Sequence, residues 1–467
     1  MKPTPCPLPK GKGFKRIGTM QRSGYILVQT LVVVTALVAL MAIMASDQRA
    51  SMQQVDAKLD QRRAEMAVDA AVARAEATLQ ATNTNLVTMN DAWATLGLNG
   101  ATPSQGTAPA PAEYQLYASD SPDQSAPTFR MQVIDAGSLI NLNAAAQAST
   151  GPLLQQTAAL QGVQQQLLDV GLTQQQVDCL LDWEQVQTTA RPDGAKDDFY
   201  NALQQPYNAK LAPLSTVNEV LLIDNWTGQT LYQPSTNSTS AMPLPVDAQG
   251  NTLPLASMVT VDSGAPNTQA DGTARVRLTA QNERQYGFTP PGRGGGRRGG
   301  RGGGPDPAVT ATSFAQLLAT QGMNPNRAAR ILNAVTFSTG RLVAKVNLNT
   351  APQAVLQTLP SMTTDLAATI VGQQSAGFST LGALATTQGV TMPVLRQVAD
   401  QFAVGSDTWI VRVYGHCGNA GVAVEATIRV TNSRPQIVTW ERINTPTVPT
   451  WWDWQDSAAT VDAASTT

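Results

Sequence analysis

An unbroken apolar segment near the amino terminus constrains this chain more than any other feature. The segment YILVQTLVVVTALVALMAIMA, from Tyr25 to Ala45, contains 21 residues and no charged side chain. At about 1.5 Å per residue, a helix of this length spans the roughly 30 Å hydrocarbon core of a bilayer. Residues 1–24 hold six Lys and Arg and no acidic residue, which places the amino terminus in the cytoplasm. We therefore expect a single membrane helix with the body of the protein across the membrane.

The apolar pattern does not stop at the end of the membrane segment. A further series follows at spacings of three, four or seven residues: Met52, Val55, Leu59, Met66, Ala70 and Ala73. These spacings predict one apolar stripe on a helix that continues to about Leu79. A cleaved secretory signal, cut after Ala45, is the alternative, but its apolar region is usually about 7 to 15 residues long. The length and the helical continuation favour a helix that stays attached.

Composition limits the chemistry that the body can perform. Hydrophobic residues make up 42% of the chain and charged residues 14%, which predicts a folded protein. Outside residues 1–24, 25 basic side chains stand against 33 acidic ones, so the body is a poor general phosphate binder. One histidine, His416, and three cysteines exclude a multi-histidine metal centre and a disulfide-dense scaffold. We expect no enzymatic activity, with a histidine-dependent envelope hydrolase as the alternative to test.

The body contains two groups of strand patterns that lie far apart in the sequence. Residues 128–135 alternate as one strand, and three more strands are predicted at 409–416, 422–431 and 436–442. We expect these four strands to form one antiparallel sheet against the carboxyl half of the long helix. The fold class is then α+β, with a large, mostly helical insertion between the first and second strands.

The insertion carries a weak internal repeat. Residues 140–146 read INLNAAA and residues 346–352 read VNLNTAP. In each copy a short strand leads to residues that can cap a helix, and Pro352 fits the first helical turn. The predicted helices are 153–168, 173–183, 352–358 and 364–374. Helix capping, rather than ligand binding, is the interpretation we prefer for the four asparagines of the motif, Asn141, Asn143, Asn347 and Asn349.

The residues around the start of the apolar segment resemble the processing site of type IV pilins and pseudopilins. The sequence SG-YILVQ implies cleavage by a prepilin peptidase between Gly24 and Tyr25, with Met1 or Met20 as the start. Members of this group usually carry glutamate at the fifth mature position, where this chain has Gln29. A carboxylate in hydrocarbon requires a partner, so its absence suggests a subunit with no neighbour beyond it.

Residues 347–384 support a rival interpretation, because they resemble helix-hairpin-helix DNA-binding modules. In such modules the hairpin after Leu-Pro carries glycines that approach phosphate, whereas here Leu359-Pro360 is followed by Ser361, Met362 and Thr363. No Lys or Arg occurs between Lys345 and Arg396. The electrostatic contribution that dominates nucleic-acid affinity is therefore missing. We expect the shape of the module, also described as SAM-like, without nucleic-acid binding.

The order of motifs over residues 20–443 is similar to that of the type II secretion system minor pseudopilin of the K type, the general secretion pathway protein K family. It comprises a prepilin-like helix, the first NLN, an Asp-Trp and Gly-Ala-x-Asp segment, NLNTAP and a last sheet ending in VTWERI. The resemblance implies a pilin-like fold and a protein that caps and initiates the pseudopilus tip for export across the outer membrane. The alternative is a membrane-anchored DNA-binding or DNA-uptake protein.

The resemblance also implies partners, a location and a division into parts. The partners are minor pseudopilins of the I and J types, the inner-membrane assembly platform, the prepilin peptidase and, as further candidates, exoprotein substrates or the secretin. The location is the inner membrane, with the body in the periplasm. The expected parts are a leader (1–24), membrane helix (25–45), periplasmic helix (46–80), first strand (128–135), first half of the insertion (136–224), flexible Pro/Gly/Arg-rich region (225–312), second half (313–405), remaining strands (406–443) and flexible tail (444–467).

Residues 182–200, DWEQVQTTARPDGAKDDFY, match a family segment associated with calcium in some relatives. Calcium takes six to eight oxygen ligands, several of them from carboxylates. This chain has Gln185, Gln187 and Lys196 where the family pattern has anions. The carboxylates that remain belong to Asp182, Asp193, Asp197 and Asp198. We prefer a loop without a cofactor, held by local turns around Trp183, and keep a calcium site at these four aspartates as the alternative.

Several remaining features have structural explanations. The stretch 291–305, PGRGGGRRGGRGGGP, is typical of a flexible surface loop. Cys6 lies in the leader, and we expect Cys179 and Cys417 to be buried thiols, with a disulfide as the alternative. Adjacent residues of a strand point to opposite faces, so His416 and Cys417 do not form a nucleophilic pair. The three tryptophans of the tail, Trp451, Trp452 and Trp454, either contact a partner or cover the edge of the sheet.

Overall fold

The structure is a computed structural model of the chain. It describes residues 22–96, 112–115, 126–144, 146, 153–187, 189–236, 243–279, 282, 285–286, 311–320, 322–443, 447–452 and 454. The chain divides into two units, Met1–Leu59 and Asp60–Thr467, which we describe separately. The glycine- and arginine-rich stretch 291–305, Cys6 and most of the predicted leader lie outside the described residues.

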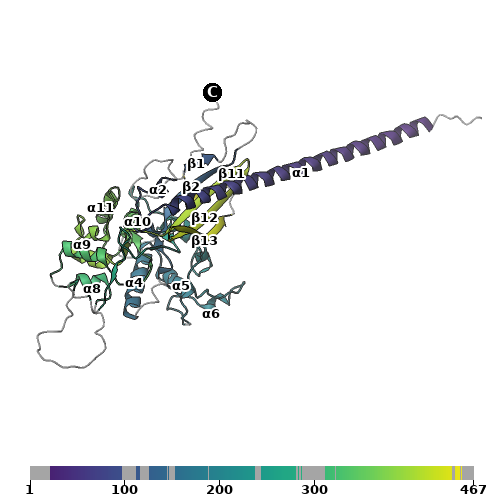
Figure 1. The fold of residues 1–467 in the computed structure, drawn as a ribbon. Coiled ribbons are helices and arrows are strands. Elements are labelled where there is room, and N and C mark those ends of the chain that lie inside the picture. The colour runs from purple at the N-terminus through teal and green to yellow at the C-terminus, as the bar shows by residue number, and fades with distance from the viewer. Residues whose placement is uncertain are drawn as a thin grey trace, which may run out of the picture. The chain divides into compact units, whose positions relative to one another are not determined.

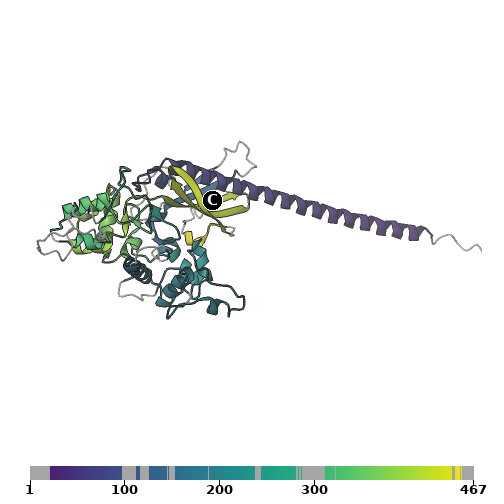
Figure 2. The same ribbon diagram turned by 60° about the horizontal axis from the view of Figure 1, so that its bottom comes forward.

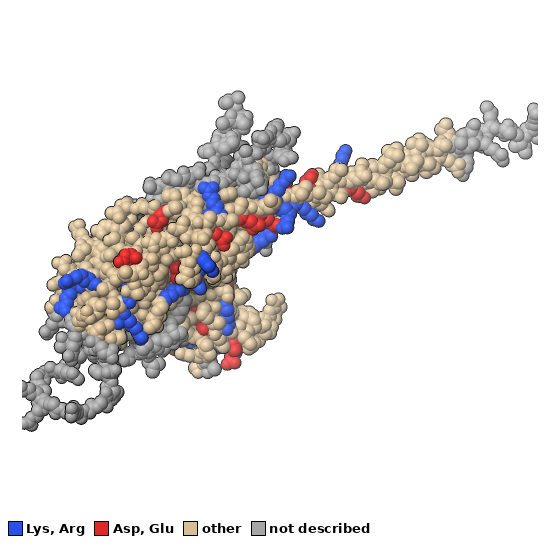
Figure 3. Space-filling model, in the orientation of Figure 1, with Lys and Arg blue, Asp and Glu red and all other residues tan. Residues whose placement is uncertain are grey.

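The first unit consists of the beginning of helix α1, Arg22–Gln80. The predicted long helix is therefore confirmed. From Leu27 onward it is long and apolar enough to cross a membrane, with a mean hydropathy of 2.5 in its most apolar window. Its apolar side chains from Leu27 to Leu59 are exposed, and Figure 3 shows the outer part of the helix in tan, without charged side chains.

The second unit contains a five-stranded antiparallel sheet in the order β1-β2-β11-β12-β13 (Figure 1). Four of its strands match the predicted ones: β2 (Thr128–Asp135), β11 (Thr408–Cys417), β12 (Ala420–Thr431) and β13 (Arg434–Ile443). The fifth, β1 (Ala112–Gln115), pairs with β2 and was missed, because its four residues lie within a Pro/Ser/Ala-rich stretch. Strands β2 and β11 pair directly, so residues 136–407 form the predicted insertion between them.

The carboxyl half of α1 packs on this sheet, but not through the stripe that the sequence suggested. Met66 is 52% exposed, and Ala73 is exposed as well. The buried face of the helix is offset from that stripe and is made of smaller residues: Ala64, Ala67, Val68, Ala71, Val72, Ala75 and Leu79. Small side chains bring the helix backbone close to the strands. A Cβ at Gly415 of β11 would lie 2.4 Å from the carbonyl oxygen of Ala64, so the glycine is required.

The insertion contains short helices around one apolar core that both of its halves share. Its helices are α4 (Leu153–Asp169), α5 (Gln174–Glu184), α6 (Asp197–Tyr200), α7 (Gly228–Tyr232), α8 (Phe314–Leu318), α9 (Pro325–Ala334), α10 (Gln353–Gln357), α11 (Thr364–Gln374) and α12 (Met392–Val398). In Figures 1 and 2 the helices α8, α9, α10 and α11 gather in one group, and α4, α5 and α6 lie in another. All four helices predicted for the insertion are present, with small shifts at their ends.

The two halves of the insertion repeat one arrangement. Strand β3 (Ile140–Asn141) pairs in parallel with β4 (Val259–Thr260), and β9 (Val346–Asn347) pairs in parallel with β10 (Phe402–Ala403). The backbone hydrogen bonds also correspond, from Ile140 and Leu142 in one half and from Val346 and Leu348 in the other. The repeat seen in the sequence is thus a repeat of structure.

The prediction that residues 225–312 form a flexible region is wrong for much of that range. Residues 225–236 and 243–279 contain α7 and the strands β4, β5 (Gly264–Ala265) and β6 (Val276–Arg277), which pair with β3, β8 (Leu342–Val343) and β7 (Val335–Thr336). Several of their apolar residues enter the core, among them Trp226, Leu231 and Met258. The strands are only two residues long, too short for an alternating pattern to reveal them.

The tail is also more ordered than predicted. Residues 447–452 and 454 pack on the sheet, with Trp452 and Trp454 buried against Ala423. The indole Nε1 of Trp454 donates a hydrogen bond to Oε1 of Gln132 at 3.1 Å. Because the neighbouring Met131 and Val133 point toward α1, Gln132 marks the opposite face. The tryptophans therefore cover a face of the sheet, not its edge.

Candidate functional site

The predicted processing site lies in the first turns of α1. Helix α1 begins at Arg22, so Gly24 and Tyr25 are helical in this unprocessed chain. Gln29, the predicted assembly position, lies one turn further and is exposed. The roles of these three positions stay predictions.

In the hydrogen bonds that the structure describes, Asn143 and Asn349 bind the backbone of distant segments, which corrects the interpretation of these side chains as helix caps. Asn143 Oδ1 accepts the N–H of Leu214 at 2.7 Å, and its Nδ2 donates to the Leu214 carbonyl at 2.9 Å. Asn349 does the same to Phe378, with an accepting distance of 2.6 Å and a donating distance of 3.2 Å. Each side-chain amide thus bonds both the backbone N–H and the backbone carbonyl of one distant residue, as a neighbouring strand would. Both asparagines are buried, so these bonds are not exchanged with water.

The first asparagine of each copy shapes its own loop. Asn141 Oδ1 accepts the N–H of Asn143 at 2.9 Å, and Asn347 Oδ1 accepts that of Asn349 at 3.1 Å. Pro352 does not occupy the first helical turn. It stands one residue earlier, at the N-cap of α10, and gives no side-chain cap. The second copy is therefore a buried bracket between chain segments rather than a helix start, whereas the first copy brackets Leu214 and also leads directly into helical Ala144.

The second bracket also ties the insertion to the sheet. Asn347 Nδ2 donates to Oδ2 of Asp135 at 2.8 Å, and the hydroxyl of Thr350 donates to the same oxygen at 2.6 Å. Asp135 is the last residue of β2, where the chain leaves the sheet. Its burial raises the pKa of the carboxyl, while the hydrogen bonds from Ser406, Thr350, Asn347 and the Gly137 backbone oppose that increase. The exit strand and the repeat motif are thus joined through a buried carboxyl group.

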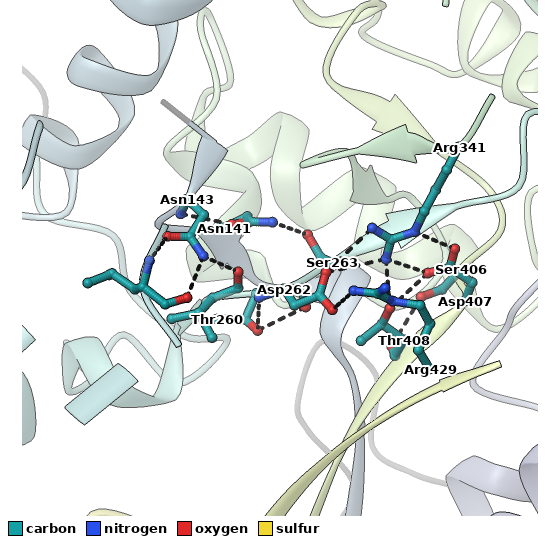
Figure 4. A network of polar contacts seen from close by, with 12 residues as sticks. Asn141, Asn143, Thr260, Asp262, Ser263, Arg341, Ser406, Asp407, Thr408 and Arg429 are labelled. Carbon is teal, nitrogen blue, oxygen red and sulfur yellow. Dashed lines mark hydrogen bonds and ion pairs between the residues drawn. The ribbon is translucent and has the colours of Figure 1, made fainter. Parts of the chain in front are cut away.

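Two arginines and two aspartates make a second joint, shown in Figure 4. Arg341, just before β8, grips Asp407 at the start of β11 with two hydrogen bonds, Nε–Oδ2 at 2.6 Å and Nη2–Oδ1 at 2.7 Å. It also donates to the hydroxyl of Thr408 at 2.8 Å. Asp262 forms two ion pairs. Its Oδ1 lies 3.4 Å from Nη1 of Arg341, and its Oδ2 pairs with Arg429 of β12. Burial alone would lower the pKa of Arg341, but Asp407 and Asp262 outweigh burial and raise it.

The first half of the insertion reaches the sheet through a third set of contacts. The amide of Asn218 donates to Glu441 of β13 and accepts a hydrogen bond from the hydroxyl of Tyr232. The ring of Tyr232 packs against Trp451 of the tail, with centroids 4.5 Å apart. Within the second unit, the insertion is therefore fastened to the sheet at its exit strand, its return strand and its last strand.

The acidic segment does not fit a calcium ion. Asp182 is buried and pairs with Arg191, with Nη1 2.6 Å from Oδ1. Asp197 Oδ1 accepts the N–H of Ala209 at 2.8 Å, whereas Asp193 and Asp198 are exposed. No three acidic, histidine or cysteine side chains converge on one point anywhere in the described part of the chain. The ammonium of Lys196 lies against the carbonyl oxygens of Asp182 and Gln185, where it would repel a metal ion.

The helix-hairpin-helix shape is present in the second half. Helices α10 and α11 flank a turn in which Ser361 has a φ of 59°. The turn presents Ser361, Thr363 and Asp365 to solvent and buries Met362. Exposed hydroxyl groups and a carboxylate offer a phosphate no positive charge.

In the described part of the chain, His416, Cys179 and Cys417 show no catalytic arrangement. His416 is exposed and stacks on Tyr414 at 6.3 Å, and Cys417 is buried on the opposite face, as predicted. Neither Cys179 nor Cys417 forms a disulfide in the described structure. Burial raises the pKa of the Cys179 thiol to about 12, which keeps it protonated.

Comparison with known proteins bears directly on the family resemblance. Residues 138–235, which include the first asparagine bracket and the acidic segment, match the family model described as "Type II secretion system (T2SS), protein K". The chain carries a type II secretion protein K domain. The family resemblance predicted from the sequence is thereby confirmed, and the α+β fold with its long helix and antiparallel sheet agrees with it.

Two further comparisons, with solved structures and with curated proteins, add little information about the family. One solved structure, "The Crystal Structure of the GspK-GspI-GspJ complex from enterotoxigenic Escherichia coli Type 2 Secretion System", contains a chain with 12% sequence identity and a TM-score of 0.40. The match covers 85% of this chain and 100% of the other. No curated protein matches the sequence.

Sequence reasoning missed the charged joint between the insertion and the sheet. Asp262, Arg341, Asp407 and Arg429 are spread over more than 160 positions and follow no local motif. The only signal was that Asp407 stands just before the predicted strand 409–416, a position shared by many surface residues, and nothing in the sequence marked Arg341. By contrast, the asparagines of the repeat did stand out in the sequence, and the structure gives them another role than the one predicted.

Proposed function

We propose that this protein is a minor pseudopilin that ends the pseudopilus and initiates its assembly in the inner membrane. The observation that carries the proposal is that two different sets of apolar side chains on α1 are buried and exposed. Alanine and valine side chains pack on the protein's own sheet, while longer apolar side chains beyond the membrane segment, Met52, Val55 and Leu59, remain exposed. Exposed apolar surface that is not needed for the fold is typical of an interface.

Assembly then follows from packing of helices. A prepilin peptidase cuts between Gly24 and Tyr25 and leaves α1 attached, so the exposed stripe packs against the equivalent helices of companion pseudopilins. The family resemblance implies that these are the I and J types and that the assembly platform receives them. Gln29 supplies no carboxylate for a subunit further along, which suits a terminal position.

The terminal position requires a rigid head. A loosely tethered domain would swing aside and allow another subunit to add, whereas a domain fixed to the sheet excludes it sterically. The brackets at Asp135 and Asp407 and the contact at Glu441 fix the insertion at three strands. This rigidity supports the capping role. Export of substrates across the outer membrane depends on the rigidity only indirectly, through assembly of the pseudopilus.

Two measurements test this proposal. Mass spectrometry of the mature protein should find an N-methylated Tyr25 at its amino terminus, whereas a start at Ser46 would show that the helix is removed. Val55→Asp should abolish co-purification with the I and J companions, because it places a charge in the proposed interface. The control is Gln54→Asp, one position away and also exposed, which should leave co-purification intact.

The hairpin between α10 and α11 keeps one rival in view, a membrane-anchored DNA-binding or DNA-uptake protein. Only the shape of that hairpin favours DNA binding. The exposed carboxylate of Asp365, without a basic residue beside it in the sequence, opposes DNA binding. Retardation of duplex DNA in a gel at moderate salt by the purified protein would support the rival, and an unchanged mobility would remove it.

A further inference from the structure

The acidic segment of the insertion contains a buried amine in an unusual position. Lys196 is 8% exposed, and its ammonium donates hydrogen bonds to the carbonyl oxygens of Asp182 and Gln185, the latter at 2.6 Å. Lysine is almost never buried unless it is paired. The surroundings therefore compensate its charge, and they do so with backbone oxygens rather than with one acidic partner.

The two carbonyl groups belong to the end of α5. The helix ends at Glu184, and Gln185 is its C-cap, so these carbonyls have no partner within the helix. The carbonyl of Trp183, between them, accepts the backbone N–H of Leu211 at 2.8 Å. A helix C-terminus carries partial negative charge, and a cation there is stabilising. Lys196 thus satisfies two acceptors and the helix dipole together.

A second cation completes the arrangement. Arg191 pairs with the buried carboxylate of Asp182, and its Nη2 donates to Oε1 of Gln185 at 2.7 Å. The backbone N–H of Arg191 donates to Oδ2 of Asp182 at 2.8 Å, so the loop itself wraps around the carboxylate. A Cβ at Gly194 would lie 2.0 Å from that oxygen, which explains the glycine.

We propose that Lys196 and Arg191 are built-in cations that hold the loop at residues 182–211 in place of a divalent metal ion. The carbonyl oxygens of Asp182 and Gln185, together with the carboxylate of Asp182, form a set of oxygen ligands of the kind that calcium prefers. In this chain the ammonium and the guanidinium occupy those oxygens. The segment is therefore stable without metal, and the replacement of acidic residues by Gln185 and Lys196 is what makes it so.

Thermal unfolding of the full-length protein in detergent micelles tests the proposal without any variant. The melting temperature should agree within about 1 °C between buffers with chelator and with millimolar calcium, because nothing is left for the metal to bind. A rise of several degrees in calcium, or micromolar binding of Ca²⁺ by isothermal titration, would overturn the proposal.

Variants test the cation directly. Lys196→Met should lower the melting temperature by about 4 °C or more, since it leaves two carbonyls and the helix end uncompensated. The control is Lys58→Met on the exposed surface of α1, which should change it by less than about 1 °C. Equal effects of the two variants would contradict the role of Lys196.

A converse variant separates a replaced cation from an ordinary buried lysine. Lys196→Glu combined with Gln185→Asp removes the ammonium and supplies carboxylates around the same carbonyls. Its melting temperature should be low in chelator and recover by several degrees in calcium. A double variant that is equally unstable, or equally stable, in both buffers would refute the claim that Lys196 occupies the place of a metal ion.

Discussion

Removal of the Arg341 side chain tests whether the insertion is rigidly joined to the sheet. Arg341→Met keeps most of the apolar stem and deletes the guanidinium that grips Asp407 and Thr408. Breaking a fully buried pair from one side costs about 3 to 5 kcal/mol. The Arg341 side chain is 28% exposed and that of Asp407 10%, so water compensates part of the loss. We expect a cost of about 2 to 3 kcal/mol for opening the joint.

Hydrogen exchange measures this cost at the joint itself. The amide of Asp407 donates to Gly264 at 2.9 Å, and that of Val430 donates to Asp407 at 2.7 Å, so both report whether the joint is closed. In Arg341→Met these two amides should exchange about 30- to 100-fold faster. The control is Arg62→Met, whose side chain is 81% exposed, so that its ion pair with Glu65 contributes little.

A double-mutant cycle guards against an indirect effect of the substitution. Arg341→Met and Asp407→Asn should couple by about 1.5 kcal/mol or more if the two side chains stabilise the joint together. Exchange within twofold of the control, together with a coupling below about 0.5 kcal/mol, would refute the reasoning.

Three other predictions concern the helix, the tail and the pH dependence of stability. Gly415→Ala should destabilise the protein by about 2 kcal/mol or more in urea unfolding, because its Cβ would meet the backbone of α1. The control Gly372→Ala has open space around it in α11 and should be neutral or stabilising. Trp454→Ala should cost about 3 kcal/mol, since it removes a buried ring whose centroid lies 4.8 Å from that of Trp452. Trp440→Ala, at a residue 44% exposed, should cost less than about 1 kcal/mol, and equal losses would show that the tail is not packed. Burial raises the pKa of Glu184 to about 8, so the folded state keeps a proton that the unfolded state loses above its ordinary value of 4.5, and stability falls as pH rises from 4.5 to 8. Glu184→Gln should remove about 3 kcal/mol of that fall between about pH 5 and pH 7.5, and an unchanged pH profile would contradict the burial of an ionisable carboxyl.

The elements that the sequence predicted well are those with a long or repeated pattern. Helix α1, the four strands of the sheet and the long helices of the insertion each extend over enough residues for periodicity to be read. Strands β3 and β9 are only two residues long and were predicted only because their motif is repeated. The two-residue strands β4 to β8 and β10 lack such a signal, and β1 is hidden among prolines and serines. Their existence depends on backbone pairing between segments that are distant in the sequence, which no local pattern encodes.

The packing of α1 shows a second limit. The sequence highlighted the larger apolar residues of the helix, such as Met66, yet the buried face is the one lined with alanine. Hydrophobicity ranks methionine above alanine, but close approach to Gly415 favours the smaller side chain. The asparagines were misjudged for a related reason, because an amide that brackets a distant backbone looks the same in sequence as one that caps a helix.

The count of this protein in each pseudopilus tests the central claim most directly. Fibres that are sheared from cells, sorted by length and analysed by quantitative mass spectrometry should contain one copy of this chain each, whatever their length, because the fixed insertion leaves no place for a further subunit. A copy number that increases in proportion to fibre length would show that the protein repeats along the fibre and would contradict the account.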